Sequence, residues 1–102
     1  MSKSEKLKKV LLAKGWDADV WWEPLRNGGI MCGAEGGYCM EIHNNDMTQL
    51  RGFHGYWLGY DFDAALAEAN RYPKNSMYEG FEYDAKANIW FDPKAIGTTE
   101  NI

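Results

Sequence analysis

The residues of this chain with the most obvious chemical reactivity lie close together in one stretch. The segment GGIMCGAEGGYCMEIHNN contains both cysteines of the chain, Cys32 and Cys39, together with Glu41 and one of the two histidines, His43. Zinc sites in proteins are built from cysteine, histidine and carboxylate side chains, and a cysteine next to a histidine can act as a nucleophile. The stretch therefore raises two hypotheses, a metal centre and a thiol catalyst.

The spacing of these residues argues against both hypotheses. Zinc sites usually contain a short pair such as Cys-x-x-Cys, whereas Cys32 and Cys39 stand seven positions apart in the sequence. If Cys39 and His43 lie on one strand they share a face, but about 13 Å of strand separates them. Zinc ligands lie about 2.0–2.3 Å from the metal. We therefore expect no metal, no cofactor and no catalytic residue, and a small enzyme using Cys39 or His54 is a lesser alternative.

The relation between the two cysteines depends on the length of the loop between them. A four-residue loop, Ala34 to Gly37, places Cys32 opposite Cys39, and a three-residue loop places Cys32 opposite Met40. The cytosol keeps thiols reduced, so neither register favours a disulfide there. We interpret both cysteines as small hydrophobic residues of a hairpin.

Length and charge limit the classes of protein that the chain can belong to. The 102 residues fit one domain, which we assign to residues 1–95, with 96–102 as a frayed C-terminal tail. The net charge is −4, and residues 1–14, with five lysines and Glu5, carry +4, so the remainder carries −8. Because nucleic-acid binding depends on lysine and arginine neutralising phosphates, we expect no direct nucleic-acid binding.

The chain shows no pattern of an exported or membrane-spanning protein. Its N-terminal apolar run, VLLA, is too short for a secretory signal, and no window approaches the length of a membrane span. These observations predict a cytoplasmic protein that binds no membrane.

Two helices are indicated by capping residues and by the spacing of apolar residues. Ser2 and Glu5 form a possible capping box at the start of the first helix, and Gly15 provides a left-handed stop. Asp61 is a suitable N-cap for the second helix, near 62–72, where apolar residues recur at helical spacing.

The remaining segments have the patterns of strands and turns. WDADVWWE alternates, residues 30–34 and 38–43 flank the turn EGG, the aromatic segment 50–60 is interrupted by glycines, and residues 76–92 contain a closing hairpin. The glycines of segment 50–60 indicate a bulge or a backbone that lies close to another element. The sequence therefore predicts a single α+β domain, with an antiparallel sheet of about five to six strands and both helices packed on one face.

The aromatic residues exceed what one face of such a sheet can bury. The chain has five Trp, six Tyr and four Phe, and the adjacent Trp21 and Trp22 must point to opposite faces of a strand. Exposed Trp and Tyr side chains commonly anchor protein interfaces. We therefore predict an aromatic binding patch with an acidic rim, formed by Trp21, Trp22, Glu23, Tyr56, Trp57, Tyr60, Asp61 and Asp63.

The patch predicts a non-enzymatic protein-binding module, an inhibitor or regulator of a protein with a basic face. In general type the chain is similar to small phage-encoded or mobile-element proteins that bind and inhibit a host factor. The alternative is a protein that binds or sequesters a small molecule or nucleotide in a pocket between the glycine-rich strands and the helix at Phe62. An exposed edge strand would also permit a homodimer.

Overall fold

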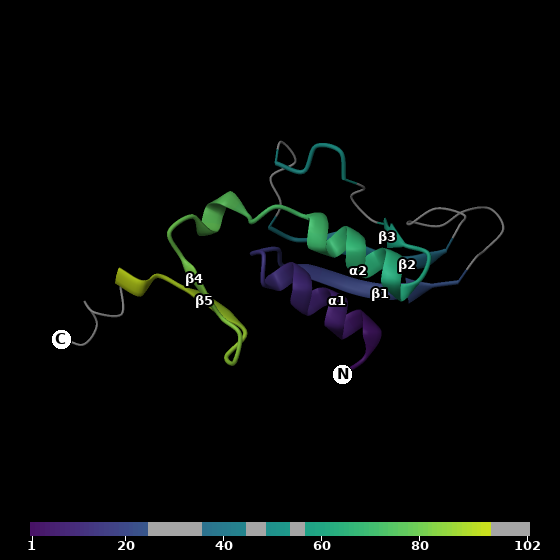
Figure 1. The fold of residues 1–102 in the computed structure, drawn as a ribbon, viewed down its shortest axis with the longest axis horizontal. Coiled ribbons are helices and arrows are strands. Elements are labelled where there is room, and N and C mark those ends of the chain that lie inside the picture. The colour runs from purple at the N-terminus through teal and green to yellow at the C-terminus, as the bar shows by residue number, and fades with distance from the viewer. Residues whose placement is uncertain (25–35, 45–48, 54–56, 95–102) are drawn as a thin grey trace.

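The protein is an α+β fold in which two helices cover one face of an antiparallel sheet. The computed structural model describes residues 1–24, 36–44, 49–53 and 57–94 (Figure 1). Along the chain the elements are α1 (Lys3–Leu12), β1 (Ala18–Glu23), β2 (Gly37–Ile42), β3 (Trp57–Gly59), α2 (Phe62–Arg71), the 3-10 helix η1 (Ser76–Tyr78), β4 (Glu82–Asp84) and β5 (Ile89–Phe91). The predicted α+β class is confirmed.

The main sheet has the strand order β1-β2-β3, with antiparallel neighbours. Cys39 of β2 pairs with Trp21 of β1 on one side and with Trp57 of β3 on the other. The register of β2 against β3 shifts between Tyr38 and Cys39, which is the irregularity that the glycines of segment 50–60 predicted. The predicted hairpin arm at 30–34 lies outside the described residues.

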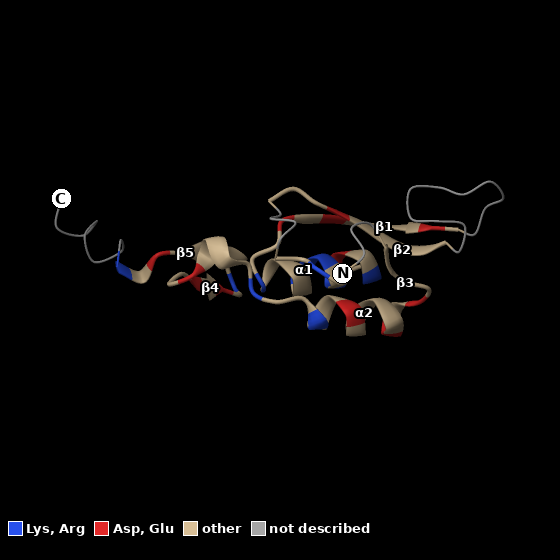
Figure 2. Ribbon diagram, turned by 90° about the horizontal axis from the view of Figure 1, so that it is seen from above, with Lys and Arg blue, Asp and Glu red and all other residues tan. Residues whose placement is uncertain are grey.

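The core lies between the sheet and the two helices, which Figure 2 shows on the same side of the sheet. Alternate residues of β1 point inward, as predicted, so Ala18 is buried while Asp19 is exposed. The buried cluster consists of Leu7, Leu11, Trp16, Ala18, Tyr38, Met40, Ile42, Leu50, Leu58, Ala65, Ala69 and Tyr72. Both helices contribute small or branched residues that let them approach the strands.

Both helices begin, and α1 ends, as the capping residues predicted. The Ser2 hydroxyl accepts a hydrogen bond from the backbone N–H of Glu5 at 3.1 Å, and the Asp61 carboxylate accepts one from the N–H of Ala64 at 2.8 Å. Gly15 follows α1 with a φ of +89°, a left-handed conformation that favours glycine.

A glycine also sets the distance between β3 and α2. A Cβ atom at Gly59 would lie 2.6 Å from the backbone nitrogen of Ala65, so α2 can pack this close only because residue 59 has no side chain. This confirms the predicted approach of the glycine-containing strand to another element.

The closing hairpin forms a sheet of its own, so the prediction of one sheet with five to six strands was wrong. Within the described ranges the strands form a three-stranded sheet and a separate two-stranded sheet of β4 and β5. The Trp90 indole stacks on Tyr78, with ring centroids 4.9 Å apart, and donates a hydrogen bond to the carbonyl of Leu12 at 2.6 Å. The hairpin therefore packs on the last turn of α1 and not beside a strand of the main sheet (Figure 1).

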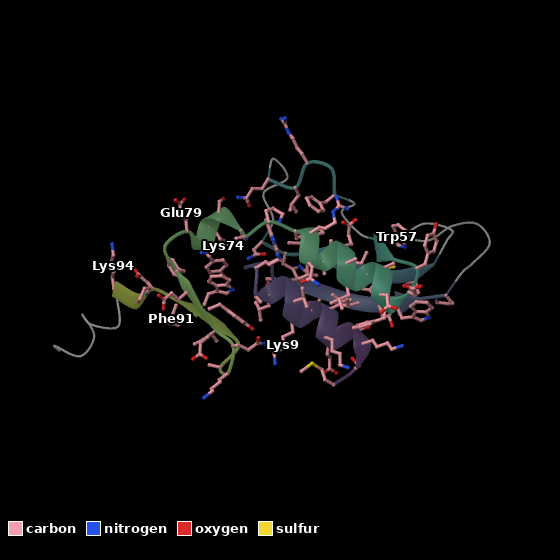
Figure 3. The ribbon with its side chains drawn as sticks, in the orientation of Figure 1. Lys9, Trp57, Lys74, Glu79, Phe91 and Lys94 are labelled. Carbon is pink, nitrogen blue, oxygen red and sulfur yellow. The ribbon has the colours of Figure 1, made fainter. Side chains whose placement is uncertain are left out.

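A buried asparagine helps to hold the closing hairpin at the last turn of α1. Asn75 is 2% exposed, and its backbone N–H donates to the carbonyl of Lys14 at 2.7 Å. Its side-chain amide donates to the carbonyl of Gly15 at 2.9 Å and its side-chain oxygen accepts from the N–H of Met77 at 3.1 Å. These bonds hold the segment before the hairpin against the end of α1. Lys74, labelled in Figure 3, then places its ammonium 5.2 Å from the Trp90 ring centroid.

Candidate functional site

The reactive residues of the cysteine-rich stretch do not form one site. Cys39 is fully buried on the face of the sheet away from the helices, and it is disulfide-bonded, so the expectation of reduced thiols was wrong. Strand and loop geometry decides whether two sulfurs can meet, and the compartment decides only whether the bond persists. The chain's other cysteine, Cys32, lies outside the described residues, as does His54. The predicted cytoplasmic location stays a prediction, and a disulfide argues against it.

His43 forms an ion pair at the opposite end of β1 from the aromatic residues. Its Nε2 lies 2.8 Å from a carboxylate oxygen of Asp19, and the ammonium of Lys8 lies 3.6 Å from the other oxygen. The hydrogen bond with Asp19 raises the pKa of His43, and nearby Glu41 and Asp17 raise it further. The same bond lowers the pKa of Asp19.

The pair is expected to make stability depend on pH in a defined window. Because the pKa of His43 is raised, the pair contributes to the stability of the folded state. This stabilisation is complete below the unfolded pKa of about 6.5 and is lost as pH rises through the folded pKa. Because the pKa of Asp19 is lowered, this group also stabilises the folded state. Its stabilisation is complete above about pH 4 and is lost as pH falls through its folded pKa. In Asp19→Asn, an NMR titration should show the His43 midpoint moved down toward 6.5.

Lys8→Gln is the matched control for this prediction, because it removes a charge beside Asp19 and leaves the hydrogen bond to His43 in place. The His43 midpoint should stay raised in this variant. An unchanged midpoint in Asp19→Asn would contradict the assigned cause.

A cluster of aromatic residues occupies the end of the main sheet where β1 ends, β2 begins and β3 ends. Trp22, Tyr38 and Phe62 lie on the helix side of this end: the rings of Trp22 and Tyr38 are 4.9 Å apart at 65°, and those of Tyr38 and Phe62 are 6.5 Å apart at 76°. We call the cluster the aromatic end; it comprises Trp21, Trp22, Tyr38, Trp57, Tyr60 and Phe62.

The other aromatic residues of this end belong to the opposite face of the sheet. Trp21 and Trp57 flank Cys39 in the two neighbouring strands, and the Trp57 ring lies 4.7 Å from that of Tyr60. Figure 3 shows Trp57 beside β3. The residues predicted to form one patch therefore reach the same end of the sheet from its two faces. Tyr56 lies outside the described residues.

Trp22 differs from the other tryptophans in what its indole N–H contacts. The indoles of Trp16, Trp57 and Trp90 donate to backbone carbonyls, and that of Trp21 donates to the Glu23 carboxylate at 3.1 Å. Within the described part of the chain, the indole N–H of Trp22 has no such acceptor. Its side chain is 53% exposed. Trp22 therefore presents a large part of an apolar side chain to the surroundings.

Acidic side chains border the aromatic end. Glu23 is the last residue of β1, Asp61 caps α2, and Asp63 is exposed in the first turn of that helix. Tyr60, which directly precedes Asp61, is 56% exposed. Glu23 binds the Trp21 indole, and Asp61 follows Tyr60 in the sequence; the acidic rim as a binding feature stays a prediction.

The helix side of the aromatic end contains a hollow. Its volume is about 390 Å³, and its lining residues are Lys3, Trp22, Tyr38, Asp61 and Phe62. These residues belong to the starts of α1 and α2, the end of β1 and the start of β2, and none of them is in the glycine-containing strand β3 that the sequence placed at a possible pocket. The sequence analysis did not name Lys3 and Tyr38 as lining residues, because they belong to elements far from Phe62 in the sequence and only packing brings them together.

The described ranges contain neither a metal-binding cluster nor a membrane-spanning helix. No group of three or more His, Cys, Asp or Glu side chains in the described ranges is arranged to hold a metal ion. Among the helices that the structure describes, each is too short or too polar to cross a bilayer.

Fold and surface together define a small α+β domain whose exposed aromatic residues gather at one end of a three-stranded sheet. Comparison of the chain with protein-family models, with curated proteins and with solved structures found no match.

Proposed function

We infer that the protein is a non-enzymatic binding module that captures another protein through the aromatic end, and that it inhibits or regulates the protein it captures. The observation that carries this proposal is the exposure of Trp22, a large aromatic residue that is 53% exposed at this end of the sheet. Every other tryptophan of the chain uses its indole N–H inside the fold.

The side chains of the aromatic end indicate which properties the partner's surface must have. Trp and Tyr anchors supply apolar contact area, and Trp22 and Tyr60 are the exposed ones here. Glu23, Asp61 and Asp63 border them, and residues 15–102 carry −8 in total. A partner with a basic face and a shallow apolar recess is complementary to this arrangement.

Replacing Trp22 with alanine is expected to abolish capture. Immobilised wild-type protein, Trp22→Ala and Tyr60→Ala are exposed to an extract of the source cells, and the retained proteins are identified by mass spectrometry. A protein retained by the wild type should be lost from both variants. With that partner purified, Trp22→Ala should raise the Kd at least about 30-fold, because truncating an interface tryptophan typically costs about 2 kcal/mol or more.

Ile89→Ala is the matched control, because Ile89 is 54% exposed and lies in β5 of the closing hairpin, away from the aromatic end (Figure 1). This variant should retain the same partner with an unchanged Kd. Equal retention by the wild type and by both aromatic variants would overturn the proposal.

A small-molecule binder or sequestering protein is the second candidate, and the hollow at Trp22 favours it. A volume of 390 Å³ is within the range of about 300–1,000 Å³ that ligand pockets occupy. Native mass spectrometry of the purified protein, compared with its denatured mass, tests this candidate. A metabolite-sized excess that Trp22→Ala removes would support it, and a bare mass would count against it.

A further inference from the structure

The hollow of the aromatic end has the construction of a cation site. Trp22, Tyr38 and Phe62 stand at 65° and 76° to their neighbours, so the three rings form walls and not a flat stack. The negative faces of aromatic rings attract organic cations, and several rings around one space strengthen the attraction. Asp61 lines the same hollow with a carboxylate.

A cation of the chain itself already lies at this hollow. The ammonium of Lys3 is 5.9 Å from the centroid of the Phe62 ring, within the range of about 6 Å over which a cation and an aromatic face attract each other. Lys3 is an exposed residue of the first turn of α1, and its long side chain can reach the hollow or leave it without any change of the backbone.

The carboxylate of the hollow is held in place by the fold. One oxygen of Asp61 accepts a hydrogen bond from the N–H of Ala64 at 2.8 Å, which fixes the side chain at the start of α2. The positive end of a helix dipole would disfavour a bound cation there, but Asp61 and Asp63 supply two negative charges within its first turn. Once the Lys3 ammonium has left the hollow, these two carboxylates favour a cation over an anion.

We propose that this hollow is a recognition site for an alkylammonium or guanidinium group on a side chain of the partner protein, and that Lys3 occupies it in the absence of the partner. The inference rests on the proposed function, because it assigns the basic residue of the partner to one place on the aromatic end. On binding, the partner's lysine or arginine displaces the Lys3 ammonium. Removing Lys3 therefore empties the site for its ligand.

The test uses the full chain and blocked amino acids as probes. The ¹H–¹⁵N signal of the Trp22 indole is followed by NMR during titration with N-acetyl-lysine methylamide, N-acetyl-arginine methylamide and the neutral N-acetyl-norleucine methylamide. The two cationic probes should shift the signal and the neutral probe should not. In Lys3→Ala the cationic probes should bind about two- to fivefold more tightly, the size of an exposed cation–π contact.

Two variants separate the parts of the site. Asp61→Asn keeps a side chain that caps α2 well, so the helix stays formed while the carboxylate is lost, and binding of the cations should weaken. Ile89→Ala changes an exposed side chain of β5, outside the aromatic end, and should leave binding unchanged. Amide signals away from the hollow report that each variant is folded.

Several results would overturn the inference. Equal shifts with the norleucine probe would show an apolar recess without charge preference. Weaker binding in Lys3→Ala, together with shifts caused by N-acetyl-glutamate methylamide, would show an anion site held by Lys3. No shift with any probe would remove the site altogether.

These outcomes are distinguishable from failure of the proposed function. If capture depended on Trp22 but the NMR titrations showed no preference for cationic probes, the protein-binding function would stand and the cation site would be overturned. If the cationic probes bound but no partner protein were captured, the hollow would stand as a cation site and the protein-binding function would be overturned.

Discussion

Trp16→Ala is expected to lower the free energy of unfolding by about 3–5 kcal/mol, the cost of truncating a large buried aromatic residue. Trp16 is completely buried between the end of α1 and the start of β1. Its indole N–H donates to the carbonyl of Pro73 at 2.7 Å, which ties the segment after α2 to the core. The substitution leaves a cavity and an unpaired carbonyl together.

Urea unfolding followed by far-ultraviolet circular dichroism measures this loss without relying on tryptophan fluorescence. Trp16→Phe, which keeps most of the ring volume but loses the indole donor, should cost less. Trp22→Ala is the surface control, because half of that side chain is exposed, and it should cost the least. If the two alanine variants lost equal stability, the placement of Trp16 in the core would be refuted.

Gly37→Ala is expected to cost about 3 kcal/mol and to disturb the pairing of β2 with β3. Gly37 has a φ of +110°, and a Cβ there would overlap the carbonyl oxygen of Gly59 and lie 3.0 Å from the Cα of Tyr60. A positive φ alone costs a residue with a side chain about 1–2 kcal/mol, and crowding adds about 1–3 kcal/mol. The neighbouring backbone must move to accommodate the methyl group.

Gly80→Ala separates these two contributions. Gly80 has a φ of +85°, but a Cβ there would meet nothing within 4 Å. This variant should therefore show only the cost of the backbone conformation, about 1–2 kcal/mol. Equal losses for Gly37→Ala and Gly80→Ala in urea unfolding would contradict the close contact of Gly37 with Gly59.

Gly37 also connects the fold to the proposed binding surface. It lies opposite Glu23 in the sheet, and Tyr60 is in the segment that a side chain at position 37 would displace. We therefore expect NMR signals of Tyr60 and Trp57 to change in Gly37→Ala, whereas Gly80→Ala should leave them in place.

The local elements followed directly from local sequence patterns. Ser2, Gly15 and Asp61 mark helix ends because their side chains, or the absence of one, act on backbone groups only a few residues away. The alternation in WDADVWWE predicted correctly that Trp21 and Trp22 face opposite sides, since successive side chains of a strand alternate. The closing hairpin, with its turn between Asp84 and Asn88, is local in the same sense.

The amino-acid sequence by itself thus determined the class of the fold, the ends of its helices, the alternation of its first strand and an excess of aromatic side chains. Only the tertiary structure decided that the closing hairpin pairs with no strand of the main sheet, that Cys39 is disulfide-bonded, and that Lys3, Trp22 and Phe62 line one hollow. The physical reason is sequence separation: caps and turns act over three or four residues, whereas strand pairing and packing join residues as far apart as Leu12 and Trp90. A local sequence pattern therefore does not determine which helices and strands pack against each other.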